Sequence, residues 1–357
     1  MKKFLALLLV LITSFAFVAC SSASSNESKV NSEGSNSESK VESSSEQESK
    51  VKDNLTFYAP DGAPALSIAK FIKDGEDFGM DANVTYNVVA ADKIAGVVTQ
   101  GKGDFVIMPV NAASKVYKAN SSDPYVMAGV VTHGNLYIVS DEEITLQGLK
   151  GKVIGVIGQG LVPDLTFKAI LSDNGLLDDV VAGDTPTEGK ISIRYFQQAS
   201  DMLPLLKQGL LTVGLLPEPA ATNLTTKVAP QKTWFRLDVQ ELYDNNAKAY
   251  PQAVLMVKKS VYNKYKTQID GFAQYFEANL TWIKTNPADA VTAINGALPD
   301  GVTPSLNAGI LSATVIDNCK IYYQTSADAK QEVKDYINKI IAVNENSAKA
   351  VLDEFFA

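Results

Sequence analysis

Apolar residues from residue 53 onward alternate between short continuous runs and longer stretches with helical spacing. The short runs predict β-strands, and stretches in which apolar residues recur every three or four positions predict helices that pack along one face. The predicted strands cover residues 55–59, 83–89, 105–108, 125–131, 136–139, 152–157, 191–196, 211–216 and 253–257. The predicted helices cover residues 63–72, 92–100, 111–118, 163–174, 199–208 and a segment starting at residue 220, and the chain is predicted to be helical from residue 260 to its end.

Strands that alternate with helices favour an α/β fold in which largely parallel sheets are covered on both faces. The alternation runs through two cycles, followed by one more strand and the helical tail. The chain is also too long for one ordinary hydrophobic core. We therefore expect two lobes joined near Ser140 and Pro251. Lobe I comprises residues 53–140 plus 251–357, and lobe II comprises residues 141–250.

The first residues carry a targeting pattern. Two lysines precede an apolar run that ends at Ala19 and Cys20. This order predicts a secretory signal peptide over residues 1–19, because the apolar core is too short to span a membrane. A cysteine directly after Ala19 resembles the bacterial lipobox, with Phe17 where that pattern prefers leucine. The resemblance implies a lipid on Cys20 that anchors the mature chain outside the cell membrane. An ordinary signal peptide with a chance cysteine is the alternative.

Residues 20–52 form the predicted tether between the membrane and the lobes. After Cys20 they are mostly Ser, Glu, Lys and Asn, with no aromatic residue. Such a segment cannot bury enough apolar surface to offset the entropy of ordering, so we expect it to be a disordered linker.

The charge of the chain bears on which classes of partner it can bind. The net charge is −8, and the only arginines are Arg194 and Arg236. Without a basic patch, nucleic acid is not an expected partner. No second long apolar run follows the signal, so the mature chain is not expected to span the membrane.

Four predicted turns connect a strand to the following helix and are built from Gly, Pro and small residues. They span residues 59–63, 108–112, 157–161 and 216–220. Ligands of open α/β sheets bind outside the carboxyl ends of the strands, where helix N-termini present free N–H groups. Gly and Pro are common between a strand and a helix, so any one of these turns by itself does not indicate a binding site. Because two fall in each expected lobe, together they predict a ligand cleft between the lobes.

Residues for catalysis are sparse. His133 is the only histidine, which excludes a His-rich metal site, and no G-x-S-x-G motif accompanies it. The turn at residues 157–161 lacks the third glycine of a dinucleotide-binding fingerprint, because Pro163 stands in its place. Cys319 is the only cysteine besides Cys20, and we expect it in the core. The sequence therefore predicts no enzyme activity, no cofactor and no metal.

Several segments together resemble one protein family. They are residues 58–64 (YAPDGAP), 103–105 (GDF), 149–156 (LKGKVIGV), 201–209 (DMLPLLKQG) and 217–219 (PEP). Over about residues 55–260 the chain is similar to the solute-binding proteins of nitrate, sulfonate, taurine and bicarbonate importers. That family includes relatives that bind the pyrimidine precursor of thiamine. The resemblance implies a two-lobed type II periplasmic-binding-protein fold, a small-molecule solute and an ABC permease as partner.

The expected ligand-binding residues lie on the four turns and beside them. The resemblance implies Asn111 and Ala112 on lobe I, and Gln159, Gly160 and Leu161 on lobe II. Tyr58, Asp61, Gly62 and Glu218 complete the set. Carboxylates oppose a bare anion, and aromatic rings favour a flat organic ligand or a cation, so we expect a small organic solute.

The expected mechanism is hinge closure of a monomer around its ligand, followed by delivery to the permease. Two alternatives are an enzyme on the same two-lobed fold and a ligand-sensing lipoprotein without a transport role.

Overall fold

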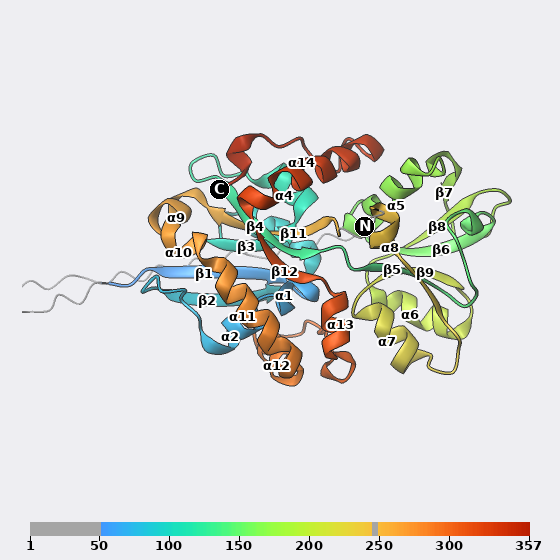
Figure 1. Cartoon of the computed structure of the whole chain (residues 1–357), viewed down its shortest axis with the longest axis horizontal. Helices are drawn as coiled ribbons and strands as arrows, with labels where there is room; N and C mark the ends of the chain where they lie inside the picture. The colour runs from blue at the N-terminus through green and yellow to red at the C-terminus, as the bar shows by residue number, and fades with distance from the viewer. Residues whose placement is uncertain (1–50, 245–248) are drawn as a thin grey trace, which may run out of the picture. The chain divides into compact units, whose positions relative to one another are not determined.

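The computed structural model describes residues 51–244 and 249–357. The predicted signal peptide, the lipid site at Cys20 and the tether up to residue 50 lie outside the described residues. The described part of the chain contains two six-stranded sheets, and helices cover their faces (Figure 1). The prediction of an α/β fold with two sheets is confirmed.

The first sheet has the strand order β12–β4–β11–β3–β1–β2. Its strands are β1 (Asn54–Pro60), β2 (Asn83–Val89), β3 (Phe105–Pro109), β4 (Tyr125–His133), β11 (Pro251–Lys258) and β12 (Ile321–Thr325). β1 is parallel to β2 and β3, whereas β11 is antiparallel to β3 and β4, and β12 is antiparallel to β4. The carboxyl ends of β1 and β3 therefore lie at the same edge of this sheet.

The second sheet has the strand order β10–β5–β9–β6–β8–β7. Its strands are β5 (Leu136–Ser140), β6 (Lys152–Ile157), β7 (Val180–Ala182), β8 (Ile191–Phe196), β9 (Val213–Pro217) and β10 (Phe235–Asp238). β6 is parallel to β8 and β9, and β7 is parallel to β8. β5 is antiparallel to β9 and β10, so the carboxyl ends of β6 and β9 share one edge.

Helices connect the strands and cover both sheets. They are α1 (Ala63–Leu66), α2 (Ala69–Asp74), α3 (Ile94–Thr99), α4 (Val110–Val116), α5 (Val162–Asp173), α6 (Ala199–Gln208), α7 (Ala220–Asn223), α8 (Val239–Tyr243), α9 (Lys259–Lys264), α10 (Lys266–Asp270), α11 (Phe272–Thr285), α12 (Pro287–Gly296), α13 (Ala313–Asn318) and α14 (Ser326–Val343). Single 3₁₀ turns lie at Ala91–Lys93, Gln147–Leu149, Leu177–Asp179, Ala308–Ile310 and Asp353–Phe355, and a π turn lies at Leu224–Val228.

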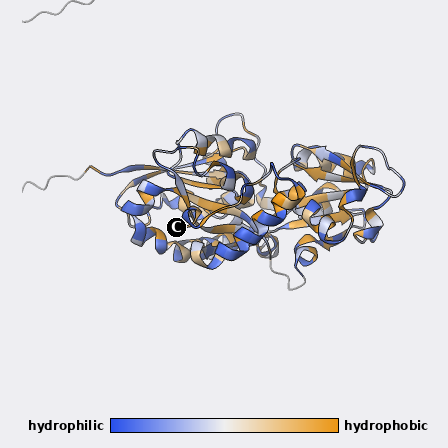
Figure 2. Cartoon of the chain, turned by 90° about the horizontal axis from the view of Figure 1, so that it is seen from above, coloured by the Kyte–Doolittle hydropathy of each residue, from blue (hydrophilic) through white to orange (hydrophobic). Residues whose placement is uncertain are grey.

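The core lies on both faces of the first sheet. On one face, Phe105 stacks on Phe57 at a centroid distance of 5.4 Å and lies tilted against Phe272 of α11 at 5.9 Å. On the other face, α14 packs against β4 and α4. It also contacts α5, the helix that follows β6 of the second sheet (Figure 1). One apolar cluster therefore joins buried residues of both sheets. Figure 2 shows the apolar residues concentrated in the strands and the polar residues on the outer faces of the helices.

The structure corrects the sequence prediction at the edge strands. The tail after residue 260 is not wholly helical, because Ile321–Thr325 forms β12 and pairs with β4. The strands β7 and β10 are also absent from the prediction. All three lie at the edge of a sheet and are five residues long or shorter, so only one neighbour stabilises them and their apolar pattern is brief. The predicted helix at residues 63–72 is instead two helices, α1 and α2.

The chain changes sheet earlier than the sequence suggested. Residues 136–140, expected at the end of lobe I, form β5 and pair with β9 and β10 of the second sheet. The first change of sheet therefore lies at Gly134 and Asn135 rather than near Ser140, because the pairing partners of a strand decide its sheet. The division into lobes I and II otherwise remains a prediction.

Candidate functional site

The four predicted turns lie at the carboxyl edges of the two sheets. Tyr58 of β1 pairs with Val106 of β3 in parallel, so these two strands end side by side. Val156 of β6 pairs with Leu215 of β9 in parallel, which places the turns after β6 and β9 side by side as well. Each sheet thus presents two strand-to-helix turns at one edge.

A two-residue crossing joins these edges. β11 pairs with the ends of both β3 and β4, so β4 ends at His133 on the same edge as β3. Two residues later, Leu136 opens β5 opposite Pro217, where β9 ends. In the crossing, the Asn135 carbonyl accepts the N–H of Glu218 at 2.9 Å. The carboxyl edges of the two sheets therefore meet at this crossing.

The first turn is held by the carboxylate of Asp61. Its Oδ2 accepts the N–H of Ser305 at 2.7 Å, and its Oδ1 accepts the N–H of Gly62 at 2.8 Å. Gly62 has a φ of 104°, a backbone conformation that favours glycine. Because both oxygens of Asp61 hold backbone amides, this carboxylate fixes the shape of the turn and ties it to the loop after α12.

The turn after β6 is held in a similar way by the buried carboxylate of Asp164. Its Oδ2 accepts the N–H of Gly160 at 2.8 Å, and its Oδ1 accepts the hydroxyl of Tyr195 at 3.0 Å. The amide of Gly160 is therefore used within the fold. Gln159 and Leu161 are exposed, so their side chains are available at the edge of the second sheet.

Glu218, in the turn after β9, is buried and fully engaged. It pairs with the guanidinium of Arg236 and accepts the hydroxyl and the N–H of Thr222 at 2.9 and 3.0 Å. The guanidinium carbon of Arg236 lies 4.0 Å from the ring centroid of Tyr137. The structure thus neutralises this carboxylate with a stacked arginine, and Glu218 holds the turn together.

The three remaining predicted residues differ in their surroundings. Asn111 is buried, its Nδ2 donates to the carbonyl of Ser347 at 3.1 Å, and its Oδ1 has no partner. Ala112 packs against the core that the two sheets share. Tyr58 lies beside Gly103, at the amino end of β3, where a Cβ on that glycine would come 3.2 Å from the tyrosine ring. Asn111 and Ala112 are therefore at the edge, whereas Tyr58 extends away from it.

Three solved structures are similar to the chain over most of its length. One is an ABC transporter protein from Parabacteroides distasonis, with 18% sequence identity and a TM-score of 0.66, covering 86% of this chain and 99% of that one. The second is the periplasmic aliphatic sulphonate binding protein SsuA from Escherichia coli, with 12% identity and a TM-score of 0.59, covering 84% and 96%. The third is the ligand binding component of an ABC-type import system from Staphylococcus aureus with zinc bound, with 10% identity and a TM-score of 0.54, covering 86% and 97%.

The chain has the α/β fold of periplasmic substrate-binding proteins, built around two sheets. The resemblance drawn from the sequence is confirmed at the level of the fold. No family model and no curated protein sequence match the chain. At these low identities the likeness concerns the fold, and the ligand of this periplasmic-binding-protein fold has to be argued from its own residues.

The crossing of this periplasmic-binding-protein fold carries polar residues that the sequence reasoning left out of the site. The buried ring of His133 stacks on Tyr322, with centroids 3.6 Å apart and an interplanar angle of 6°. Its Nε2 lies 3.2 Å from Oε1 of Gln324. Burial lowers the pKa of His133 to about 4, so the ring is neutral at pH 7. The available signal was the polar run Thr-His-Gly-Asn at residues 132–135, between two apolar strands.

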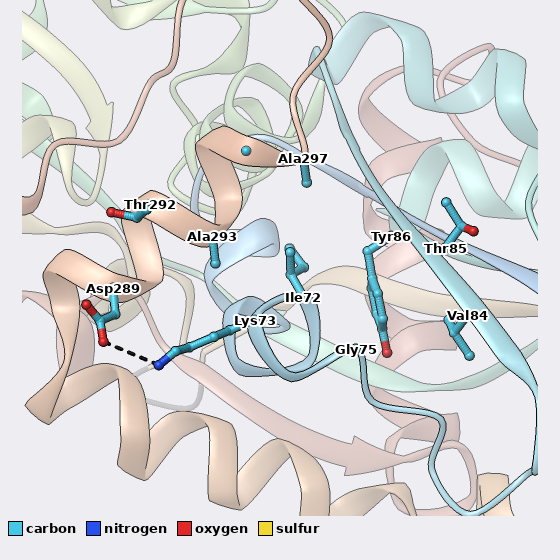
Figure 3. A pocket seen from close by; sticks show the side chains of 11 residues that line it. Ile72, Lys73, Gly75, Val84, Thr85, Tyr86, Asp289, Thr292, Ala293 and Ala297 are labelled. Carbon is cyan, nitrogen blue, oxygen red and sulfur yellow. Dashed lines mark hydrogen bonds and ion pairs between the residues drawn. The ribbon is translucent and has the colours of Figure 1, made fainter.

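Two cavities lie away from the crossing. One of about 690 Å³ is bounded by α2, the edge strand β2 and α12 (Figure 3). Lys73 and Asp289 pair at 3.4 Å beside it, and Ile72 and Tyr86 form part of its wall. The other, of about 570 Å³, lies along α11 near Trp282. Neither cavity is lined by a residue of the four turns.

Two further observations concern residues 51–244 and 249–357. No helix in these segments is apolar over enough of its length to cross a bilayer. Within the same residues, no group of three or more His, Cys, Asp or Glu side chains could hold a metal ion. Cys319 is buried, so the prediction of a core cysteine is confirmed. Burial, together with the charge of Glu218, raises the pKa of its thiol.

Proposed function

We propose that the chain is the solute-binding component of an ABC importer. It captures a small organic molecule between the two carboxyl edges and passes it to a membrane permease, without a catalytic step. The observation that carries this proposal is the two-residue crossing between the carboxyl edges of two separate sheets. A ligand placed there contacts turns of both sheets, so its binding free energy depends on how the sheets are oriented. The likeness to ABC-importer binding proteins supports this function.

Capture by hinge closure requires the angle between the sheets to change at the crossing. A ligand that contacts both edges favours the closed state, because only that state supplies both sets of contacts. α14 restricts the motion. The hydroxyl groups of Tyr336 on α14 and Thr166 on α5 lie 2.6 Å apart, and Lys339 pairs with Asp173 at 2.9 Å. Opening and closing therefore pivot about this contact or rearrange it.

The extracytoplasmic location in this proposal rests on the sequence pattern of residues 1–52. A lipid on Cys20 holds the protein, as a monomer, at the outer surface of the cell membrane. The Ser-rich tether lets it reach the permease. Mass spectrometry of the protein isolated from membranes should therefore give an N-terminal acylated Cys20.

A distance measurement tests the closure. Cysteines placed at the exposed positions Thr281 on α11 and Lys207 on α6 carry a pair of fluorescent labels, one beside each sheet. The native cysteines should not react, because Cys319 is buried and Cys20 carries the proposed lipid. Native mass spectrometry of the purified full-length chain identifies the compound that it carries. We expect that compound to change the distance between the labels and to raise the unfolding midpoint.

A matched control pair places both labels beside the first sheet, at Thr281 and the exposed Asn263 on α9. The distance between these labels should not respond to the compound. If the compound stabilises the protein while the distance between the sheets stays constant, the closure mechanism is wrong.

A further inference from the structure

The crossing gathers hydrogen-bonding atoms that are buried and have no partner. They are Asn111 Oδ1, Thr132 Oγ1, His133 Nδ1, Asn135 Oδ1, Gln252 Oε1 and the hydroxyl of Tyr250, whose ring adjoins Gly134. Thr132 and His133 end β4, Asn135 lies in the crossing, Gln252 is the second residue of β11, and Asn111 follows the end of β3. Most buried polar groups in folded proteins are paired, so a group of unpaired ones at one edge requires an explanation.

The orientation of His133 follows from a chain of hydrogen bonds. Gln324 donates its Nε2 to the carboxylate Oε2 of Glu332 at 3.1 Å. The other side of the Gln324 amide, Oε1, therefore faces His133 Nε2 at 3.2 Å and must accept a hydrogen bond from an N–H there. A neutral ring protonated on Nε2 has a bare lone pair on Nδ1. His133 thus offers an acceptor at the crossing.

The two asparagines are oriented by backbone carbonyls. Asn111 donates its Nδ2 to the carbonyl of Ser347 at 3.1 Å, and Asn135 donates its Nδ2 to the carbonyl of Glu218 at 3.2 Å. Rotating either amide by 180° would set two oxygens against each other, so both Oδ1 atoms remain acceptors. Among the other groups, the hydroxyls of Thr132 and Tyr250 and the amide of Gln252 can also donate.

We propose that the ligand of this site is a nitrogen compound with several N–H donors, such as an amide, an amidine or an amino-substituted heterocycle. The inference rests on the proposed function and narrows its ligand class. An N–H donor supplies what Asn111, His133 and Asn135 lack, whereas a sulfonate, sulfate or nitrate group presents only acceptors and leaves these atoms unpaired. The nearby guanidinium of Arg236 is already paired with Glu218, so it is not free to balance an anion.

The test compares two series of probes on the full-length chain after removal of any bound compound. The donor series is benzamidine, benzamide, cytosine and adenine, and the oxyanion series is benzenesulfonate, ethanesulfonate, sulfate and nitrate. We expect increases in the unfolding midpoint, and binding by calorimetry, only in the donor series. Benzamidine and benzenesulfonate share one ring and differ in the head group, so their comparison isolates the donor requirement.

A substitution tests the donor requirement independently. Gln252→Glu replaces an amide by a carboxylate of the same shape and should tighten the binding of benzamidine by about tenfold, because a charge-assisted bond is stronger. Gln274→Glu, at an exposed position on α11, is the matched control and should leave binding unchanged. If Gln252→Glu fails to fold, Thr132→Val serves instead. It replaces a hydroxyl by a methyl group at nearly constant side-chain volume, and it should weaken the binding of the donor series.

Two results would overturn the inference. One is an oxyanion that binds more tightly than every member of the donor series. The contradiction would be strongest if this binding depended on Lys320, which lies close to His133 because its backbone carbonyl accepts the backbone N–H of His133 at 3.0 Å. The other is the absence of binding by the whole donor series up to about 10 mM, a concentration above the dissociation constants of weak ligands. The proposed function is judged separately, because the distance between the labels on α11 and α6 responds to any ligand that bridges the edges.

Discussion

A methyl group added at Gly134 should destabilise the crossing strongly. A Cβ at this position would lie 2.4, 2.5 and 2.8 Å from three carbons of the Tyr250 ring, closer than carbon atoms can approach. The ring has little room to retreat, because Tyr250 is buried and stacks on Tyr336 with centroids 5.4 Å apart. Overpacking of a core costs about 1–3 kcal/mol, and we expect Gly134→Ala at the upper end, about 3 kcal/mol.

Urea and thermal denaturation of the full-length chain measure this effect. A loss of that size lowers the unfolding midpoint by about 6–12 °C, at about 2–4 °C per kcal/mol for a large domain. Gly296→Ala is the control, because a Cβ at this exposed helical position meets nothing within 4 Å, and it should be neutral or stabilising by up to about 1 kcal/mol. The double variant with Tyr250→Leu should recover part of the loss. If Gly134→Ala costs less than about 0.5 kcal/mol, the steric argument for the crossing is refuted.

Two further predictions concern titration and charge. The pKa of His133 is about 4 in the fold and 6.5 for the free side chain, so its contribution to stability is complete above pH 6.5 and is lost as the pH falls towards 4. The loss amounts to about 3 kcal/mol at 1.36 kcal/mol per pKa unit, and urea denaturation at several pH values should show a steeper decline for the native chain than for His133→Gln. Equal slopes would contradict the buried neutral ring. Glu218→Ala leaves Arg236 without its partner and should cost about 3 kcal/mol, while Glu345→Ala, at an exposed position, should change the free energy of unfolding by less than about 0.5 kcal/mol. A small effect at Glu218 would show that the pair is replaced by water.

The regular elements could be predicted because their signals are local. The strands β1, β3, β6 and β9 are apolar runs bounded by Gly and Pro, and each turn that follows them opens a helix. Such signals depend only on neighbouring residues, and long runs repeat them often enough to be read. The same patterns identified the four turns at which the carboxyl edges lie.

The roles of individual side chains in those turns could not be predicted. Asp61 and Glu218 were predicted to contact a ligand, which stays a prediction, and the structure shows that they also hold Ser305 and Arg236. These partners are 244 and 18 residues away in the chain, so no local sequence pattern predicts them. The sequence shows that a carboxylate is present, whereas the fold decides which donor it meets.

By itself, the sequence determined the α/β class, the alternation of elements and the positions of the turns, because hydrophobic periodicity and turn chemistry act over a few residues. Only the tertiary structure decided that residues 136–140 join the second sheet, that β12 pairs with β4, and that polar atoms of residues such as His133 and Asn135 are buried without a partner. Pairing between distant strands depends on the free energy of the whole sheet. The exposure or burial of one polar atom depends on everything packed around it.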